Sequence, residues 1–207
     1  MTLEEKNQND ILNEFNDPND IEFIFGDKPI NRFKTKPELE DKISLLAKLK
    51  NDLQNIKNCE LKESAKKLVF SDGNSNSKIM IVGEGPGQKE DEVGKPFVGD
   101  AGLLLNKMLK AININRQDIY ITNVVNYRPP NNRKPEPAEI TRYSEYLRKH
   151  ISIINPKILI LMGSTAMESL FGSKIKISKE RGNWKDVIIN KKSYLTIRTV
   201  HPAYLLR

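Results

Sequence analysis

The sequence contains a single cysteine and very little histidine. Because Cys59 is alone among 207 residues, no internal disulfide can form. The two histidines, His150 and His201, are far apart, and a zinc site built on them would need carboxylate ligands as well. We therefore expect neither a disulfide nor a zinc site, as is typical of proteins of the reducing cytoplasm.

Long apolar runs are also missing. No stretch of about 18 apolar residues is present to span a bilayer. The N-terminus is polar and acidic, whereas a secretory signal begins with basic residues followed by apolar ones. We expect a cytoplasmic protein that does not contact a membrane.

Charge is distributed unevenly along the chain. Residues 1–28 hold eight acids and two lysines, a net charge of −6, and because the whole chain carries +7 the remainder carries +13. A basic body favours a polyanionic partner, and nucleic acid is the first candidate. The alternative is a lysine-rich surface without a binding role.

The segment from Lys78 to Leu109 is predicted to form a strand, a loop and a helix in that order. Residues 79–82 are all apolar, as in a strand that is buried on both faces. The loop over 83–87 contains three glycines, which allow a close approach to a ligand. Glycines between a strand and a helix are also typical of nucleotide binding, but no Gly-Lys-Ser/Thr ending follows them. Nucleotide binding therefore stays open as an alternative.

Strands and helices alternate through the rest of the chain. Apolar patterns predict further strands over residues 119–125, 157–162 and 194–200, with helices between them. This order predicts an α/β fold, a three-layer α/β/α sandwich with a mostly parallel four-stranded central sheet. The predicted organisation is an acidic, partly ordered arm, an N-terminal helix and a main domain, over residues 1–36, 37–57 and 58–207.

Three polar residues come at or just beyond the ends of predicted strands. They are Glu84, Asn123 and His201. Ligands of open parallel sheets bind beyond the carboxyl ends of the strands. We therefore expect these three side chains to converge on one site.

Four stretches closely resemble, in sequence order, the motifs of bacterial family 4 (type-4) uracil-DNA glycosylases. They are GEGPG followed by GKPFVGDAG, TNVVNYRPPNNR, RGNW and HPAYLLR. The resemblance implies the uracil-DNA glycosylase fold. It also implies an enzyme that hydrolyses the N-glycosidic bond of deoxyuridine in DNA, releases uracil and leaves an abasic site, which initiates base-excision repair.

The resemblance implies roles for individual residues. Phe97 matches the aromatic residue that stacks on the flipped base, and His201 matches the histidine that donates to the base O2. Glu90 matches the residue near C5 of uracil, where it would exclude the thymine methyl group. Asn123 carries a donor and an acceptor that suit O4 and N3–H of uracil. The alternatives are a core aromatic for Phe97 and a turn cap for Asn123.

The residue that activates water is harder to assign. Gly85 stands where better-known glycosylase families place a water-orienting aspartate. We expect the neighbouring Glu84 to position the water or the loop, and we group Glu84, Gly85 and His201 as the catalytic set. The predicted DNA contacts lie in the proline-rich loop and at the C-terminus: Arg128, Asn132, Arg133, Leu205, Leu206 and Arg207.

Type-4 enzymes usually hold a 4Fe-4S cluster with four cysteines. In this sequence Cys59 matches one ligand position, whereas Ile56, Tyr127 and Tyr143 match the other three. Because one thiolate cannot hold such a cluster, we expect no cluster and no other cofactor.

The sequence thus predicts a monomeric uracil-DNA glycosylase that acts on single- or double-stranded DNA. The main alternative is a catalytically impaired DNA-binding module of the same fold. A nucleotide-binding enzyme is the weaker alternative.

Overall fold

The structure, a computed structural model, describes residues 41–172 and 176–206. The predicted arm over residues 1–36 therefore lies outside the described residues, and so does Arg207. Within the described ranges, no helix is both long and apolar enough to cross a membrane.

A central sheet of six strands organises the fold, in the order β1-β3-β2-β4-β6-β5. Its strands are β1 (Asp72–Gly73), β2 (Ile79–Gly83), β3 (Tyr120–Asn123), β4 (Ile158–Met162), β5 (Trp184–Ile189) and β6 (Lys192–Thr199). The four inner strands run parallel, whereas β1 and β5 pair antiparallel at the two edges. The predicted mostly parallel α/β sheet is confirmed.

The prediction of four strands is wrong, because it missed both edge strands. β1 is only two residues long, which is too short to produce a periodic pattern. In β5 only Val187 and Ile189 are buried, and Lys185 and Asp186 interrupt the apolar run. An edge strand with one face in water does not need the continuous apolar sequence of an inner parallel strand.

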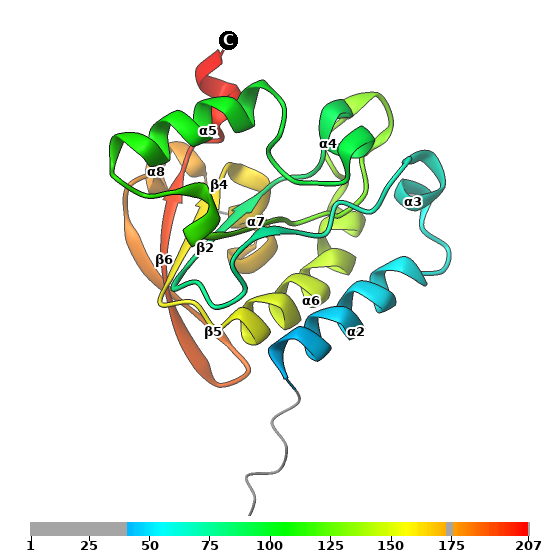
Figure 1. Ribbon diagram of the computed structural model, residues 1–207, viewed down its shortest axis with the longest axis horizontal. Helices are drawn as coiled ribbons and strands as arrows, with labels where there is room; N and C mark the ends of the chain where they lie inside the picture. Colours follow the sequence, from blue (N-terminus) through cyan, green and yellow to red (C-terminus); the bar gives the residue numbers. More distant parts are fainter. Residues whose placement is uncertain (1–40, 173–175, 207) are drawn as a thin grey trace, which may run out of the picture. The chain divides into compact units, whose positions relative to one another are not determined.

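Helices cover both faces of the sheet (Figure 1). The α-helices are α2 (Lys42–Gln54), α3 (Glu60–Ser64), α4 (Gln88–Val93), α5 (Asp100–Ala111), α6 (Pro137–Ile154), α7 (Ser164–Phe171) and α8 (Ile177–Glu180). Short 3₁₀ helices are η1 (Arg116–Asp118), η2 (Pro130–Asn132) and η3 (Pro202–Leu206). Helix α5 lies on one side of the sheet, and α6 with α2 lies on the other.

The two faces of the sheet form separate apolar cores. Met80 and Val82 of β2 pack with residues of α6 and α7, whereas Ile81 between them packs with Leu105 and Leu109 of α5. This alternation follows from the pleat of a strand, which points successive side chains to opposite faces. The glycine-rich loop at the end of β2 is therefore held between two packed layers.

Apolar residues at helical spacing form the buried faces of the helices in the main domain. On α6 they are Ile140, Tyr143, Leu147, Ile151 and Ile154. Helix α2 buries Leu49 and Leu53, but Ile43 is 67% exposed because it lies in the first turn, beyond the contact. The glycine-rich loop over 83–87 is followed by the short helix α4 before α5 begins.

His150 has the structural role that its place on α6 predicts. It is fully buried, its Nε2 lies 2.7 Å from the Tyr120 hydroxyl, and its ring stacks on Phe70. Burial lowers the pKa of His150 to about 3, so the side chain is neutral.

Candidate functional site

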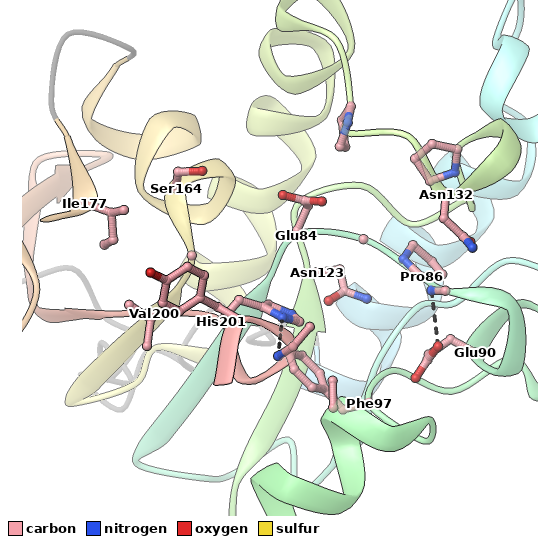
Figure 2. Close-up of a pocket in the computed structure, with 18 of the residues that line it drawn as sticks. Glu84, Pro86, Glu90, Phe97, Asn123, Asn132, Ser164, Ile177, Val200 and His201 are labelled. Carbon is pink, nitrogen blue, oxygen red and sulfur yellow. Dashed lines mark hydrogen bonds between the residues drawn. The ribbon is translucent and has the colours of Figure 1, made fainter. Parts of the chain in front are cut away.

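A cavity of about 640 Å³ opens beyond the carboxyl ends of the parallel strands. Eight of the predicted site residues line it: Glu84, Gly85, Glu90, Phe97, Asn123, Asn132, Arg133 and His201. Figure 2 shows Glu84, Asn123 and His201 arranged around the same space, although they come from separate segments of the chain. The expectation that these three polar residues converge is confirmed.

Asn123 presents an amide inside this cavity. It is the last residue of β3, it is 3% exposed, and its Nδ2 has no hydrogen-bond partner within residues 41–172 and 176–206. Its Oδ1 lies only 2.5 Å from the position that a Cβ of Gly83 would occupy. A glycine at position 83 is therefore required for the amide to lie here, and the free N–H₂ is available to a ligand.

His201 follows β6 and its imidazole lines the cavity. The backbone N–H of Ala203 donates to Nδ1 at 3.2 Å, so in the neutral ring the proton lies on Nε2. Burial lowers the pKa of His201, while the nearby charges of Glu84 and Glu90 act in the opposite direction. His201 is therefore a neutral hydrogen-bond donor through Nε2.

Glu84 is fixed by a threonine from a distant part of the chain. The hydroxyl of Thr165, at the start of α7, donates to Glu84 Oε2 at 2.5 Å. Thr165 is fully buried and Glu84 is half-buried. The second carboxylate oxygen of Glu84 remains available to accept a hydrogen bond from water in the cavity.

Glu90 connects the two loops that flank α4. Its Oε1 accepts from the backbone N–H groups of Val98 and Gly99 at 2.9 and 2.7 Å, and its Oε2 accepts from Gly87 at 3.1 Å. Three amide donors satisfy much of the hydrogen-bonding capacity of this buried carboxylate. Glu90 therefore stabilises the loop and also borders the cavity.

Phe97 belongs both to the core and to the cavity wall. It is 5% exposed and packs with Ile81 and Leu105 beneath the loop. Its ring also stacks against His201, with centroids 5.4 Å apart and an angle of 25° between the planes. Phe97 is thus a core aromatic residue that also lines the cavity.

The predicted DNA contacts have mixed positions. Arg128 donates to Asn132 Oδ1, and Arg133 donates to both oxygens of Glu139 at 2.7 and 2.8 Å. These bonds order the proline-rich loop next to the cavity. Leu205 and Leu206 of η3 lie outside the cavity lining, and each is 53% exposed.

Comparison with known proteins identifies the family. Residues 70–207 match the family described as "Uracil DNA glycosylase superfamily". A type-4 uracil-DNA glycosylase from Thermotoga maritima is 45% identical over 72% of this chain and 77% of its own length. Those from Sulfurisphaera tokodaii and Archaeoglobus fulgidus are 42% and 36% identical, over 78% and 75% of this chain and 76% and 80% of their lengths.

The chain belongs to the type-4 uracil-DNA glycosylases. This membership contradicts the prediction that the protein has no cofactor, because type-4 uracil-DNA glycosylases are the family that contains an iron-sulfur cluster. We withdraw that prediction.

Cys59 is the one thiol among the residues that match the four cluster-ligand positions of the family, since Ile56, Tyr127 and Tyr143 stand at the other three. Cys59 is buried 3.3 Å from the Tyr143 hydroxyl, and the Tyr127 hydroxyl donates to the Leu53 carbonyl. Across the described part of the chain, no group of three or more His, Cys, Asp or Glu side chains is placed to hold a metal ion. One thiolate beside two tyrosine hydroxyls does not fit a four-thiolate cluster.

Sequence reasoning missed the part of the cavity wall that follows β4. Gly163 and Ser164 come directly after this strand and line the cavity, and the next residue, Thr165, donates to Glu84. The rule that located Glu84 and Asn123 applied here as well, since β4 is parallel to β2. Ser178 of α8 and Arg181 also line the cavity. Arg181 opens the RGNW stretch of the family resemblance, which implied no role for this residue, whereas no local pattern indicated Ser178.

Proposed function

We propose that this protein hydrolyses the N-glycosidic bond of deoxyuridine in DNA and so initiates base-excision repair. As a member of the type-4 family the chain is a DNA glycosylase. The observation that supports the substrate most directly is the unpartnered Nδ2 of Asn123 in the cavity. A buried donor without a partner costs about 1–3 kcal/mol, which a carbonyl oxygen of the ligand would offset.

Recognition of uracil follows from the donors and acceptors in the cavity. The nucleotide must first flip out of the stack to reach it. Asn123 then donates from Nδ2 to uracil O4 and accepts N3–H at Oδ1. Cytosine presents an amino group and an unprotonated N3 at these positions, so both contacts fail. Phe97 supplies the stacking surface, and Glu90 lies where it would exclude a methyl group at C5.

Bond cleavage places positive charge on the sugar and negative charge on the base. When the C1′–N1 bond breaks, its electron pair moves onto uracil, and His201 stabilises the charge at O2 through Nε2–H. Glu84 accepts a hydrogen bond from the water that attacks C1′, beside the small residue Gly85. The hydroxyl group of this water forms the new bond to C1′. The remaining proton of the water goes to the uracil anion, so uracil is released as a neutral base.

The DNA contacts, the cellular setting and the assembly state complete the proposal. Arg128, Asn132 and Arg133 border the DNA backbone, together with Arg207, while Leu205 and Leu206 enter the space of the flipped nucleotide. We propose a bacterial, cytoplasmic monomer that accepts single- or double-stranded DNA. The cytoplasmic location is supported by Cys59, a free cysteine of the kind that persists in a reducing compartment.

The test is incubation with a labelled oligonucleotide that carries one uracil, followed by alkali to cleave abasic sites. We expect cleavage at uracil by the wild type and its loss in His201→Ala and Asn123→Ala. Salt-sensitive DNA binding without cleavage would favour the impaired DNA-binding module instead. Absence of both would contradict the proposed function.

A further inference from the structure

Phe97 has a backbone conformation that an aromatic residue rarely adopts. Its φ is 51°, in the left-handed region, where a side chain with a Cβ is disfavoured. Such a strained conformation persists only where surrounding contacts determine it. The contacts on both sides of Phe97 therefore set the position of its ring.

Arg116 of η1 makes the contacts on one side. Its Nη2 donates to the Pro96 carbonyl at 2.6 Å, and its Nη1 donates to the Phe97 carbonyl at 2.9 Å. The same guanidinium is anchored by Asp72 of β1 at 2.9 Å and by Asn106 of α5 at 3.1 Å. Arg116 thereby joins the two carbonyls to a strand and a helix of the sheet layers.

Glu90 and α5 hold the other side of the turn. Glu90 accepts the N–H groups of Val98 and Gly99, which follow Phe97 directly. A Cβ at Gly102 would lie 1.9 Å from the Phe97 carbonyl oxygen, so the backbone is seated on the first turn of α5. Arg116 does not line the cavity, so it would not contact a base bound there directly.

We propose that Arg116 is a positioning residue that fixes the ring of Phe97 for stacking on the flipped base. This inference rests on the function proposed above. With Arg116 in place, the ring lies against Gly83, close to Asn123 and His201. Without it, two carbonyls lose their donors and the left-handed turn can relax, which moves the stacking surface away from the amide that binds uracil.

The test is a double-mutant cycle on kcat/KM for a uracil-containing oligonucleotide. We expect Arg116→Gln to lower kcat/KM roughly tenfold to a hundredfold, as the loss of two hydrogen bonds implies. In a Phe97→Ala background the same change should have less than a twofold effect, because Arg116 acts through that ring. Arg148→Gln is the matched control, since Arg148 also donates to a backbone carbonyl, that of Leu170, away from the cavity.

Amide hydrogen exchange tests the turn independently of activity. We expect the N–H groups of Val98 and Gly99 to exchange at least tenfold faster in Arg116→Gln than in the wild type or in Arg148→Gln. If the wild type lacks glycosylase activity, the proposed function fails, while this exchange still reports on the turn. An unchanged exchange rate in Arg116→Gln would overturn the inference. So would an equal loss of kcat/KM from Arg116→Gln in the wild-type and Phe97→Ala backgrounds. If Arg116→Gln does not fold, Arg116→Lys replaces it in the double-mutant cycle and in the exchange measurement, because lysine keeps the charge but not the paired donors.

Discussion

His201 illustrates how single contacts define chemistry at the residue scale. The Ala203 N–H occupies Nδ1, so a proton added there would displace this hydrogen bond. Burial lowers the pKa of the ring, and the carboxylates of Glu84 and Glu90 only partly oppose this effect. The imidazole therefore stays neutral at neutral pH, and in the proposed reaction it would stabilise the anion by donating from Nε2 rather than by a full charge.

The charge of Glu84 gives a test of this account by NMR. We expect His201 to titrate below 6.5, and Glu84→Gln to lower its pKa further, because the carboxylate favours the protonated ring. The chain has only two histidines, so the ring C–H signals are easily separated. The variant His150→Phe lacks the signal of His150, so the signal that remains belongs to His201. A rise in the pKa of His201 in Glu84→Gln would contradict the electrostatic argument.

The Thr165 hydroxyl gives a second prediction at this scale. We expect Thr165→Val to lower kcat/KM roughly tenfold, because a hydrogen bond to a charged group contributes about 1.5–3 kcal/mol. Thr165→Ser keeps the hydroxyl and should retain most activity. Single-turnover cleavage of a uracil oligonucleotide measures both variants. Equal activity of the valine and serine variants would show that Thr165 does not position Glu84.

At the scale of elements, α8 is attached to the sheet by an ion pair. Arg198 of β6 is 1% exposed, and its Nη1 lies 2.5 Å from Glu180 Oε2, a close contact of charges without good hydrogen-bond geometry. Its guanidinium also lies over the ring of Phe171, 5.2 Å from the centroid. Next to Glu180, Arg181 lines the cavity. The ion pair thus connects the sheet to one wall of the site.

We expect Glu180→Gln to destabilise the fold by about 2 kcal/mol. A buried charge that loses its partner costs 3–5 kcal/mol, and we reduce this value because the Glu180 side chain is 28% exposed. Thermal or denaturant unfolding measures the change. Lys89→Gln removes an exposed pair with Asp100 and is the control, with an expected change of less than about 0.5 kcal/mol. Equal effects of the two variants would contradict this role of Arg198.

At the scale of the whole molecule, the buried His150 couples global stability to pH. Its pKa is about 3 in the folded protein and near 6.5 in an unfolded chain. As the pH falls below 6.5, the unfolded chain binds a proton that the folded protein does not bind. The contribution of His150 to stability is therefore complete above that pH and is lost progressively toward pH 3.

We expect the free energy of unfolding at pH 4.5 to lie about 2–3 kcal/mol below that at pH 7 through His150 alone. His150→Phe keeps an aromatic ring on Phe70 and should show a correspondingly smaller difference. Urea unfolding at both pH values measures this. An identical pH dependence in the two proteins would show that His150 is not the source.

The net charge of the whole molecule predicts a strong salt dependence of DNA binding. Residues 29–207 carry a net charge of +13. If about three phosphates are neutralised, affinity falls roughly 40-fold between 50 and 200 mM salt. Arg128→Gln should reduce the slope of log K against log salt by about 1, whereas Arg148→Gln should leave it unchanged. An unaltered slope in Arg128→Gln would exclude Arg128 as a phosphate contact.

Local pattern was sufficient to locate the inner strands and the first three polar residues of the site. Uninterrupted apolar runs marked β2 and β4, and the rule on strand ends placed Glu84 and Asn123 at one edge. The same reasoning missed β1 and β5, because an edge strand has too little buried surface to impose a pattern. The single cysteine also led to the prediction that the protein has no cofactor, which membership of the type-4 family contradicts.

The sequence by itself therefore determined the class of fold, the positions of its inner strands along the chain and the side chains that converge at their ends, since these depend on periodicity along the chain. Only the tertiary structure decided how those side chains are held. Thr165 contacts Glu84 across 81 positions of sequence, and Arg116 contacts Phe97 across 19. Neither pairing leaves a periodic trace, because each depends on which loops the packed sheet brings together.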